Sequence, residues 1–268
     1  MKRIATLTMI LAAATTAVCA QAPKPVPCPD PPGYRDTPQI PGQPWKVHDI
    51  DRPRPERVKG SVAATPPPSD AIVLFDGKGL DRWTSYRRGE ELAPQWKVEN
   101  GTLTVAGRGD LVTKEQFGDI QLHLEWKPGI AKCGQNRGNS GVILMGRYEI
   151  QVLESYNNET YADGQAASMY GQFPPLKNAT NPEEEWNSYD ILFKAPKFEG
   201  GKMVSPPVVT VIHNGVAVHH GQAFVGQMAH RIHKPFEAHG PEAPLVLQNH
   251  NEATSFRNIW VRRVGSYD

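Results

Sequence analysis

Residues 148–154, with the sequence YEIQVLE, contain two carboxylates that could act together on a sugar. Side chains alternate along a strand with a period of two, so Glu149 and Gln151 share one face. Glu154 lies an odd number of residues from Glu149 and would face away on a regular strand, unless a β-bulge between them brings both carboxylates together. Such a pair can serve as acid and base on a glycoside. The alternative is that Glu154 is a solvated strand end.

Short β-branched or aromatic runs fill residues 69–268 and must supply the scaffold for these carboxylates. In the run IQLHLEWK the alternation is strict, with Gln121, His123 and Glu125 on the polar face, which is typical of a half-buried antiparallel strand. Many such strands with no alternation of strands and helices predict an all-β protein, a two-sheet β-sandwich of the jelly-roll, concanavalin A-like kind.

Turn and loop signals separate these runs. Asn100-Gly101 and Asn214-Gly215 are typical of tight hairpin turns. Residues 157–185 are too long for a hairpin and carry Gly, Pro, Tyr and Met, so we expect a functional loop that covers one face of the sandwich.

The chain begins with a predicted export signal and a proline-rich arm. Residues 1–20 have the charged start, apolar run and small-residue cleavage site of a signal peptide, which predicts a periplasmic or extracellular protein; lipid attachment at Cys19 is the less favoured alternative. Residues 21–68, here called the N-terminal arm, hold 14 of the 25 prolines. This composition predicts an extended linker or a strap on the surface of the β-sandwich domain, residues 69–268. Part of the arm has an apolar and aromatic composition that favours docking.

Two cysteines remain after the predicted cleavage, Cys28 in the arm and Cys133 in a Gly-rich loop. A single disulfide between them is one interpretation. No CxxC spacing supports metal ligation by this pair. Two unpaired or loosely paired cysteines are the favoured interpretation.

Composition excludes several classes of function. With 29 Lys and Arg against 28 Asp and Glu, the net charge is +1 and no basic block is present, so nucleic acid is not an expected partner. No later segment has the apolar length of a transmembrane helix. No dinucleotide fingerprint, phosphate-binding loop, GxSxG or HExxH motif occurs.

Two resemblances bear on function. The segment around Glu149 resembles the bulged ExDxxE strand of laminarinase-type glycoside hydrolases, with Gln151 in place of the central Asp. A wider resemblance covers residues 72–263 through LFDGKGLDRW, WKVENGTLTV, RGNSGVILMGRYEIQVLES, EEWNSYDILFKAP and LVLQNHNEATSFRNIWVR. On these motifs the chain is similar to the 3-keto-disaccharide hydrolase family, also known as domain of unknown function 1080.

The second resemblance implies a concanavalin-like sandwich that acts on a glycoside oxidised at C3. The 3-keto group acidifies the C2 proton, so a base can remove it, the group at C1 can leave by elimination, and water can then add. This chemistry needs a base, donors for the enolate oxygen and an acid for the leaving group, but no nucleophile, so Gln151 is acceptable. A separate sugar 3-dehydrogenase would have to supply the ketone.

The resemblance also suggests roles for single residues. Catalytic candidates are Glu149, Glu154 and His250, and candidates for substrate binding are Asn139, Gln151, Tyr170, Trp186, Gln248 and Arg257. Four of the binding candidates have a structural alternative. Asn139 could be a turn residue, Tyr170 and Trp186 could be core aromatics, and Arg257 could be a buried ion-pair partner of Glu149.

No cofactor is firmly implied, although a divalent metal ion would suit enolisation as an electrophile. The histidines at 219, 220, 230, 233 and 239 invite a metal interpretation, but their loop is basic and no carboxylate is close in sequence. If a metal binds, we expect it at Glu149, Glu154 and His250.

Three functions therefore remain open: an exported hydrolase or eliminase of small 3-keto-glycosides, an ordinary endo-β-glucanase, and a noncatalytic carbohydrate-binding module. The absence of a central carboxylate at Gln151 argues against the second.

Overall fold

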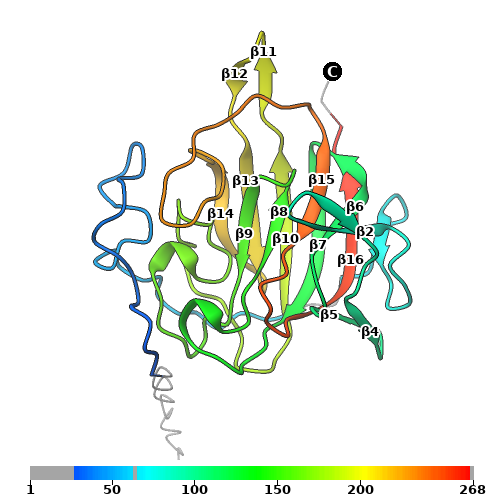
Figure 1. Cartoon of the computed structure of the whole chain (residues 1–268), viewed down its shortest axis with the longest axis horizontal. Coiled ribbons are helices and arrows are strands. Elements are labelled where there is room, and N and C mark those ends of the chain that lie inside the picture. The colour runs from blue at the N-terminus through cyan, green and yellow to red at the C-terminus, as the bar shows by residue number, and fades with distance from the viewer. Residues whose placement is uncertain (1–26, 63–64, 266–268) are drawn as a thin grey trace, which may run out of the picture.

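The structure is a computed structural model that describes residues 27–62 and 65–265. Two antiparallel sheets pack face to face, and the N-terminal arm runs along one side of them (Figure 1). The two-sheet β-sandwich predicted from the alternating runs is confirmed.

The smaller sheet has six strands, and it carries the segment with the candidate carboxylates. Its strands in spatial order are β3 (Glu90–Leu92), β2 (Trp83–Arg87), β6 (Asp110–Phe117), β15 (Ala243–Leu247), β8 (Ser140–Leu144) and β9 (Tyr148–Val152).

The larger sheet has eight strands and packs against the core-facing side of the smaller one. Its order is β14 (Val216–Ala223), β13 (Val208–His213), β10 (Asn187–Lys194), β7 (Ile120–Lys127), β16 (Ser255–Arg263), β5 (Thr102–Thr104) and β4 (Lys97–Glu99), with β1 (Ile72–Phe75) also paired to β16. A separate hairpin, β11 (Lys197–Glu199) and β12 (Lys202–Ser205), extends from one end of the sandwich (Figure 1).

The core lies between the sheets and fixes which side chains of β9 face outward. Tyr148, Ile150 and Val152 are fully buried in the core. The Tyr189 hydroxyl of β10 donates to the Gln151 carbonyl oxygen at 2.8 Å, which ties β9 to the larger sheet. By alternation, the side chain of Glu149 must lie on the face turned away from the core.

The polar face of β7 is more buried than its alternation predicts. His123 and Glu125 are 0% and 3% exposed, because His123 stacks on Trp260 and Glu125 pairs with Arg257. The interpretation of β7 as a half-buried strand is therefore wrong at these positions. Ion pairs make the burial possible, and a hydrophobic pattern cannot reveal them.

Both Asn-Gly dipeptides form the turns expected of them. Asn100 and Gly101 have φ angles of 49° and 73°, and Asn214 and Gly215 have 50° and 77°. Two successive left-handed residues match the twist of a hairpin, and they connect β4 to β5 and β13 to β14.

The described part of the N-terminal arm, residues 27–62 and 65–68, is docked on the sandwich. Ile40 and Val47 are buried, and the Arg52 guanidinium donates to the Gln172 carbonyl oxygen at 2.9 Å. Arg54 donates to the carbonyl oxygen of Thr160 at 2.6 Å. These bonds run to the long loop after β9, so the arm is a strap on this part of the molecule rather than a free linker.

Cys28 and Cys133 form a disulfide, with Cα atoms 5.5 Å apart. The favoured interpretation of two unpaired cysteines is wrong. Their sequence separation of 105 gave no local spacing signal, and only the docking of the arm brings the two thiols together.

The predicted signal peptide and Cys19 lie outside the described residues. Within the described ranges the helices are short 3-10 turns, η1 (Gly134–Asn136) and η2 (Ala162–Gly164), and none is long and apolar enough to cross a bilayer.

Candidate active site

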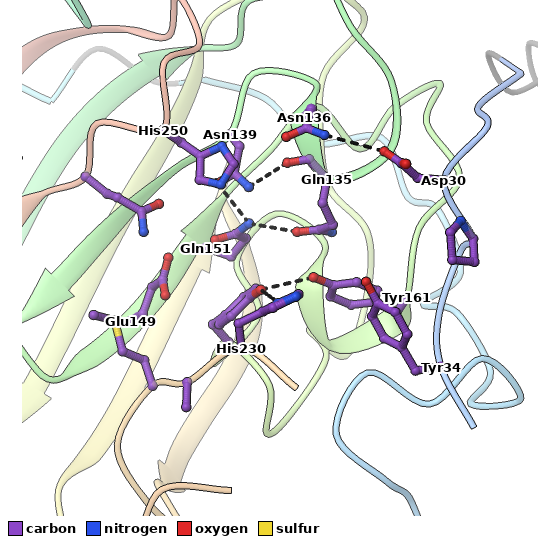
Figure 2. Close-up of a pocket in the computed structure, with 15 residues that line it drawn as sticks. Asp30, Tyr34, Gln135, Asn136, Asn139, Glu149, Gln151, Tyr161, His230 and His250 are labelled. Atoms are coloured by element: carbon purple, nitrogen blue, oxygen red, sulfur yellow. Dashed lines mark hydrogen bonds between the residues drawn. The ribbon is translucent and has the colours of Figure 1, made fainter. Parts of the chain in front are cut away.

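A cavity of about 450 Å³ lies on the outer face of β8 and β9. This volume falls in the lower half of the range usual for small-molecule sites. The walls are polar and aromatic, and Figure 2 shows them converging from several loops. The lining residues are Asp30, Pro31, Tyr34, Gln135, Asn136, Asn139, Glu149, Gln151, Tyr161, Tyr170, Met228, Ala229, His230, Gln248 and His250.

Glu149 is the buried carboxyl of this cavity. It is 4% exposed, and its carboxyl lies so close over Gly141 of the neighbouring strand that a Cβ there would overlap with Oε1. Burial raises the pKa of Glu149 to about 8, and the negative charge of Asp110 adds to this shift. Glu149 therefore holds a proton through most of the neutral range.

Gln151 lies beside that carboxyl and can bond to it in either protonation state. The atom at the end of its amide that faces Glu149 is 2.9 Å from Oε1. If that atom is the amide oxygen, it accepts the carboxylic proton; if the amide is turned, its NH₂ group donates to the ionised carboxylate. One residue thus supports the acid before and after proton transfer.

A chain of hydroxyl and imidazole groups forms a second wall. The Tyr170 hydroxyl lies 3.0 Å from the Tyr161 hydroxyl and 3.1 Å from His230 Nδ1. Burial raises the pKa of Tyr170 above its ordinary value, so the phenol is neutral and can donate a hydrogen bond. The ring of Tyr161 stacks on His48 with centroids 4.0 Å apart.

The stretch after β15 completes the cavity. The Gln248 backbone N–H donates to the Gly141 carbonyl oxygen at 3.0 Å, which continues the sheet pairing beyond Leu247 and sets Gln248 over the cavity. His250 Nδ1 is buried and has no hydrogen-bond partner within the described residues. Burial also lowers the pKa of His250, so its imidazole is neutral at neutral pH and can accept a proton.

Six of the candidate residues from the sequence line this one cavity. They come from three separate stretches of chain: Asn139, Glu149, Gln151, Tyr170, Gln248 and His250. The long loop between β9 and β10 supplies Tyr170, and its backbone N–H donates to the Glu149 carbonyl oxygen at 3.1 Å. The loop therefore lies over the face of the sandwich that holds the cavity, as expected, and its functional role stays a prediction.

Glu154 is not brought to Glu149. Strand β9 pairs with β8 in unbroken register, so the bulge that would have turned both carboxylates to one face is absent from this pair. The Glu154 carboxylate instead accepts hydrogen bonds from the N–H groups of Tyr156 and Asn157 at 2.6 and 3.0 Å and pairs with Arg137 at 3.1 Å. This arrangement holds the turn after β9, and Glu154 is not among the residues that line the cavity.

Trp186, directly before β10, and Arg257 of β16 lie outside the cavity and contact each other. The Arg257 guanidinium is 4.1 Å from the centre of the Trp186 ring. Its Nε donates to Glu125 Oε2 at 2.6 Å, so the partner of Arg257 is Glu125 and the alternative of an ion pair with Glu149 is wrong. Position in the FRNIWVR motif did not reveal which face of β16 the arginine occupies.

Several lining residues were not assigned to the site by sequence reasoning. Asp30, Pro31 and Tyr34 come from the N-terminal arm. Gln135 and Asn136 come from η1, and Tyr161 directly precedes η2. The aromatic and polar residues among the prolines of the arm were the only signal. Their place at the cavity depends on long-range docking.

The histidines do not gather into a metal site. Within residues 27–62 and 65–265, no group of three or more His, Cys, Asp or Glu side chains has the proximity needed to hold an ion. Several of the loop histidines are instead hydrogen-bonded to groups other than carboxylates. His230 bonds to Tyr170, His233 to the Val225 carbonyl oxygen, and His239 to Tyr148 and the Gly240 carbonyl oxygen. The trio of Glu149, Glu154 and His250 is not assembled, because Glu154 lies outside the cavity.

Comparison with known families and proteins bears on the chemistry of this site. Residues 70–262 match the family model described as a 3-keto-alpha-glucoside-1,2-lyase-like domain. The 3-keto-disaccharide hydrolase of Bacteroides thetaiotaomicron is 27% identical over 156 residues, which cover 45% of this chain and 51% of that protein. The chain thus matches about half the length of this curated relative.

Solved structures from Parabacteroides distasonis share the fold. One, of a candidate glycosyl hydrolase, is 40% identical, with a TM-score of 0.71, and the match covers 83% of this chain and 99% of that one. A second candidate glycosyl hydrolase is 19% identical, with a TM-score of 0.53 over 73% of this chain and 94% of that one, and supports the fold alone.

Proposed function

Since the chain belongs to the family of 3-keto-alpha-glucoside-1,2-lyase-like domains, we propose that it cleaves 3-keto-glycosides by elimination across C1 and C2 of the sugar. One observation carries the proposal: Glu149 and His250 line the same small cavity, and their pKa values are shifted in opposite directions. Two groups whose pKa values are shifted apart in this way supply an acid and a base at the same pH.

The reaction balances without an external oxidant or reductant. A base takes the C2 proton, and the electron pair of the C–H bond forms an enolate with the C3 ketone. The enolate then collapses to form the C1–C2 double bond, the C1–O bond breaks, and the leaving oxygen takes a proton from an acid. Water adds at C1 and a proton returns to C2, so the sum is hydrolysis to the free 3-keto-sugar.

The shifted pKa values support one assignment of the two proton transfers. Neutral His250 is the base for the C2 proton, because burial lowers its pKa and keeps the imidazole unprotonated. Glu149, with a pKa of about 8, is the acid for the leaving oxygen. Gln151 accepts from the carboxylic proton before the transfer and, with its amide turned, donates to the carboxylate after it.

Neutral donors around the cavity suit the enolate and the sugar hydroxyls. Asn139 and Gln248 carry amide groups, and Tyr170 carries a neutral phenol held by Tyr161 and His230. Donors that are already oriented stabilise a developing enolate oxygen more effectively than water does, because they need not reorganise during the reaction.

The experiment that tests the proposal is product analysis on a 3-keto-glucoside and on its unoxidised parent, with and without a metal chelator. We expect release of the leaving group from the keto compound alone. Glu149→Gln should lower kcat/KM by about 10²–10⁴-fold, the usual contribution of a general acid. Sensitivity to the chelator would add a metal ion to the scheme.

The matched control is Glu159→Gln, which removes an exposed carboxyl from the loop after β9 and should leave kcat/KM unchanged. Cleavage of the unoxidised parent would instead indicate an ordinary glycosidase, with Asp30 as the second carboxylate of the cavity. Turnover of neither compound would overturn the enzymatic proposal and favour a carbohydrate-binding module.

Export and a metabolic partner belong to the same proposal. The Cys28–Cys133 disulfide supports a periplasmic or extracellular location, because such bonds persist in oxidising compartments. The reaction neither makes nor reduces the 3-keto group. A separate sugar 3-dehydrogenase must therefore supply the substrate.

A further inference from the structure

The N-terminal arm forms a wall of the cavity although it precedes the stretch that matches the family. Asp30, Pro31 and Tyr34 line the cavity, whereas the family match begins at residue 70. In Figure 2, Asp30 and Tyr34 lie on the opposite side of the cavity from Glu149. The part of a ligand that reaches them is therefore the part farthest from the proposed acid.

We infer that the arm is the leaving-group subsite: Tyr34 and Asp30 bind the second sugar ring of a 3-keto-disaccharide and so determine which glycosides the site accepts. The inference rests on the proposed function, which places the keto ring beside Glu149. It adds that the enzyme selects a saccharide leaving group, and that the selecting residues come from outside the family domain.

Tyr34 offers an aromatic surface with fixed neighbours. Its ring lies 6.1 Å from those of Tyr161 and His230, centroid to centroid, and the Arg231 guanidinium lies 4.1 Å from its centre. Arg231 is held in turn by Asp36 at 2.8 Å. A half-buried aromatic ring beside hydrogen-bonding groups suits a sugar, which has apolar C–H faces and a polar rim.

Asp30 is held beside the turn that supplies the next part of the wall. The disulfide of Cys28 ends at Cys133, the residue directly before η1, and Asn136 of η1 has its amide nitrogen 3.5 Å from Asp30 Oδ2. The exposed carboxylate can accept hydrogen bonds from two hydroxyls of a second ring. Covalent attachment fixes this end of the arm against the cavity.

On the other side of Tyr34 the arm is anchored by His48, which is fully buried. Its Nδ1 lies 3.2 Å from Asp163 Oδ1 and its backbone N–H donates to Asp163 Oδ2 at 3.0 Å. Its ring stacks on Tyr161, which belongs to the chain of groups leading to Tyr170. Anchors on both sides of Tyr34 keep its ring in place. Binding a ligand therefore costs little conformational entropy at this residue.

The test measures binding in a Glu149→Gln background, where the substrate survives, by titration calorimetry with two ligands. One is a 3-keto derivative of an α-linked glucose disaccharide, and the other is methyl 3-keto-α-glucoside, whose methyl group is too small to reach the arm. We expect Tyr34→Ala to weaken disaccharide binding about 5- to 10-fold, as loss of an aromatic contact does. Affinity for the methyl glucoside should stay within twofold.

Three further variants make the result specific. Tyr34→Phe keeps the ring and should bind the disaccharide nearly as well as the parent protein. Arg35→Ala is the matched control, because Arg35 is the next residue of the arm but is exposed and pairs with Asp51. Replacing both Cys28 and Cys133 by Ser should repeat the loss of disaccharide affinity, because the Asp30 end of the arm is then released.

Equal weakening of both ligands by Tyr34→Ala would overturn the inference, since it would indicate a structural effect on the whole cavity. Unchanged binding of both, or no binding of either, would overturn it as well. Turnover of the same ligands by the protein with Glu149 intact is recorded separately. Selective binding without turnover would contradict the proposed reaction but would still support the subsite.

Discussion

The protonation of Glu149 decides the pH range in which the proposed elimination can run. With Glu149 as the acid, kcat/KM should fall as pH rises through about 8, because the carboxyl then loses the proton that the leaving group needs. The negative charge of Asp110 contributes to the raised pKa, so Asp110→Asn should move this limb to lower pH. A pH–rate profile of both proteins measures the shift.

The direction of the limb tests the assignment of roles. A rate that rises through pH 8 would mean that Glu149 acts as the base in its ionised form, and His250 would then take the role of acid. In the exposed-carboxyl control, Glu159→Gln, the limb should stay at its original pH.

Glu149 should also affect folding stability. The side chain that supports activity should lower the free energy of unfolding at alkaline pH. Its folded pKa of about 8 lies above its ordinary value of 4.5, so the folded state binds the proton more tightly and loses stability as pH rises between these values. Glu149→Gln removes this loss. The variant should match the wild type at pH 4.5 and exceed it by about 1–4 kcal/mol at pH 8.5.

Denaturant unfolding of the two proteins across this pH range measures the difference. Because all other titrating groups are shared, the difference isolates Glu149. A constant difference from pH 4.5 to 8.5 would contradict the raised pKa.

At the scale of elements, the pairing of β7 with β16 depends on a buried charge network. Although burial acts to raise it, hydrogen bonds from His123, Asn258 and Arg257 bring the pKa of Glu125 to about 2. Glu125→Gln leaves these partners without their carboxylate. We expect a loss of about 2–3 kcal/mol at pH 7, below the full cost of breaking a buried pair because Arg257 is partly exposed.

The stabilising effect of Glu125 has a defined pH range. It is present above pH 4.5 and is lost as pH falls toward 2, so wild type and variant should converge in acid. Because Glu125 and Arg257 lie on the larger sheet, kcat/KM of the folded variant should equal that of the wild type. A drop in kcat/KM without loss of stability would indicate that Arg257 takes part in the reaction.

The strands of the sandwich were predictable because their information is local. Alternation in the IQLHLEWK and YEIQV runs and the Asn-Gly turns depend on neighbours a few residues apart. The missing bulge in β9 was not predictable in this way. It depends on pairing with β8, where unbroken register leaves Glu154 past the strand end, held by Arg137.

The site was predictable only where motif residues also faced the cavity. Glu149, Gln151 and His250 met both conditions, whereas Trp186 and Arg257 are in motifs but belong to another face of the sandwich. No local pattern identifies the contributions of the arm, because its docking depends on contacts more than one hundred residues away in sequence.

At the scale of the whole molecule, the Cys28–Cys133 disulfide should stabilise the fold. It closes a loop of 105 residues, for which chain entropy predicts about 4–5 kcal/mol. Noncovalent anchors such as His48 with Asp163 keep part of the arm in place, so we expect reduction to cost about 2–4 kcal/mol.

Denaturant unfolding with and without a phosphine reductant measures this cost. The Cys28→Ser/Cys133→Ser double variant, which should show no response to the reductant, is the control. An equal midpoint for oxidised and reduced wild type would contradict the stabilising role.

The position of the arm has a consequence for synthesis of the chain. Asp30 and His250 line the same cavity, so the site joins segments 220 residues apart and cannot exist on a nascent chain that stops short of the last strands. Contacts this distant form late and slow folding. A saccharide can therefore stabilise only the finished protein, by mass action on the native state, and cannot assist the folding intermediates that precede it.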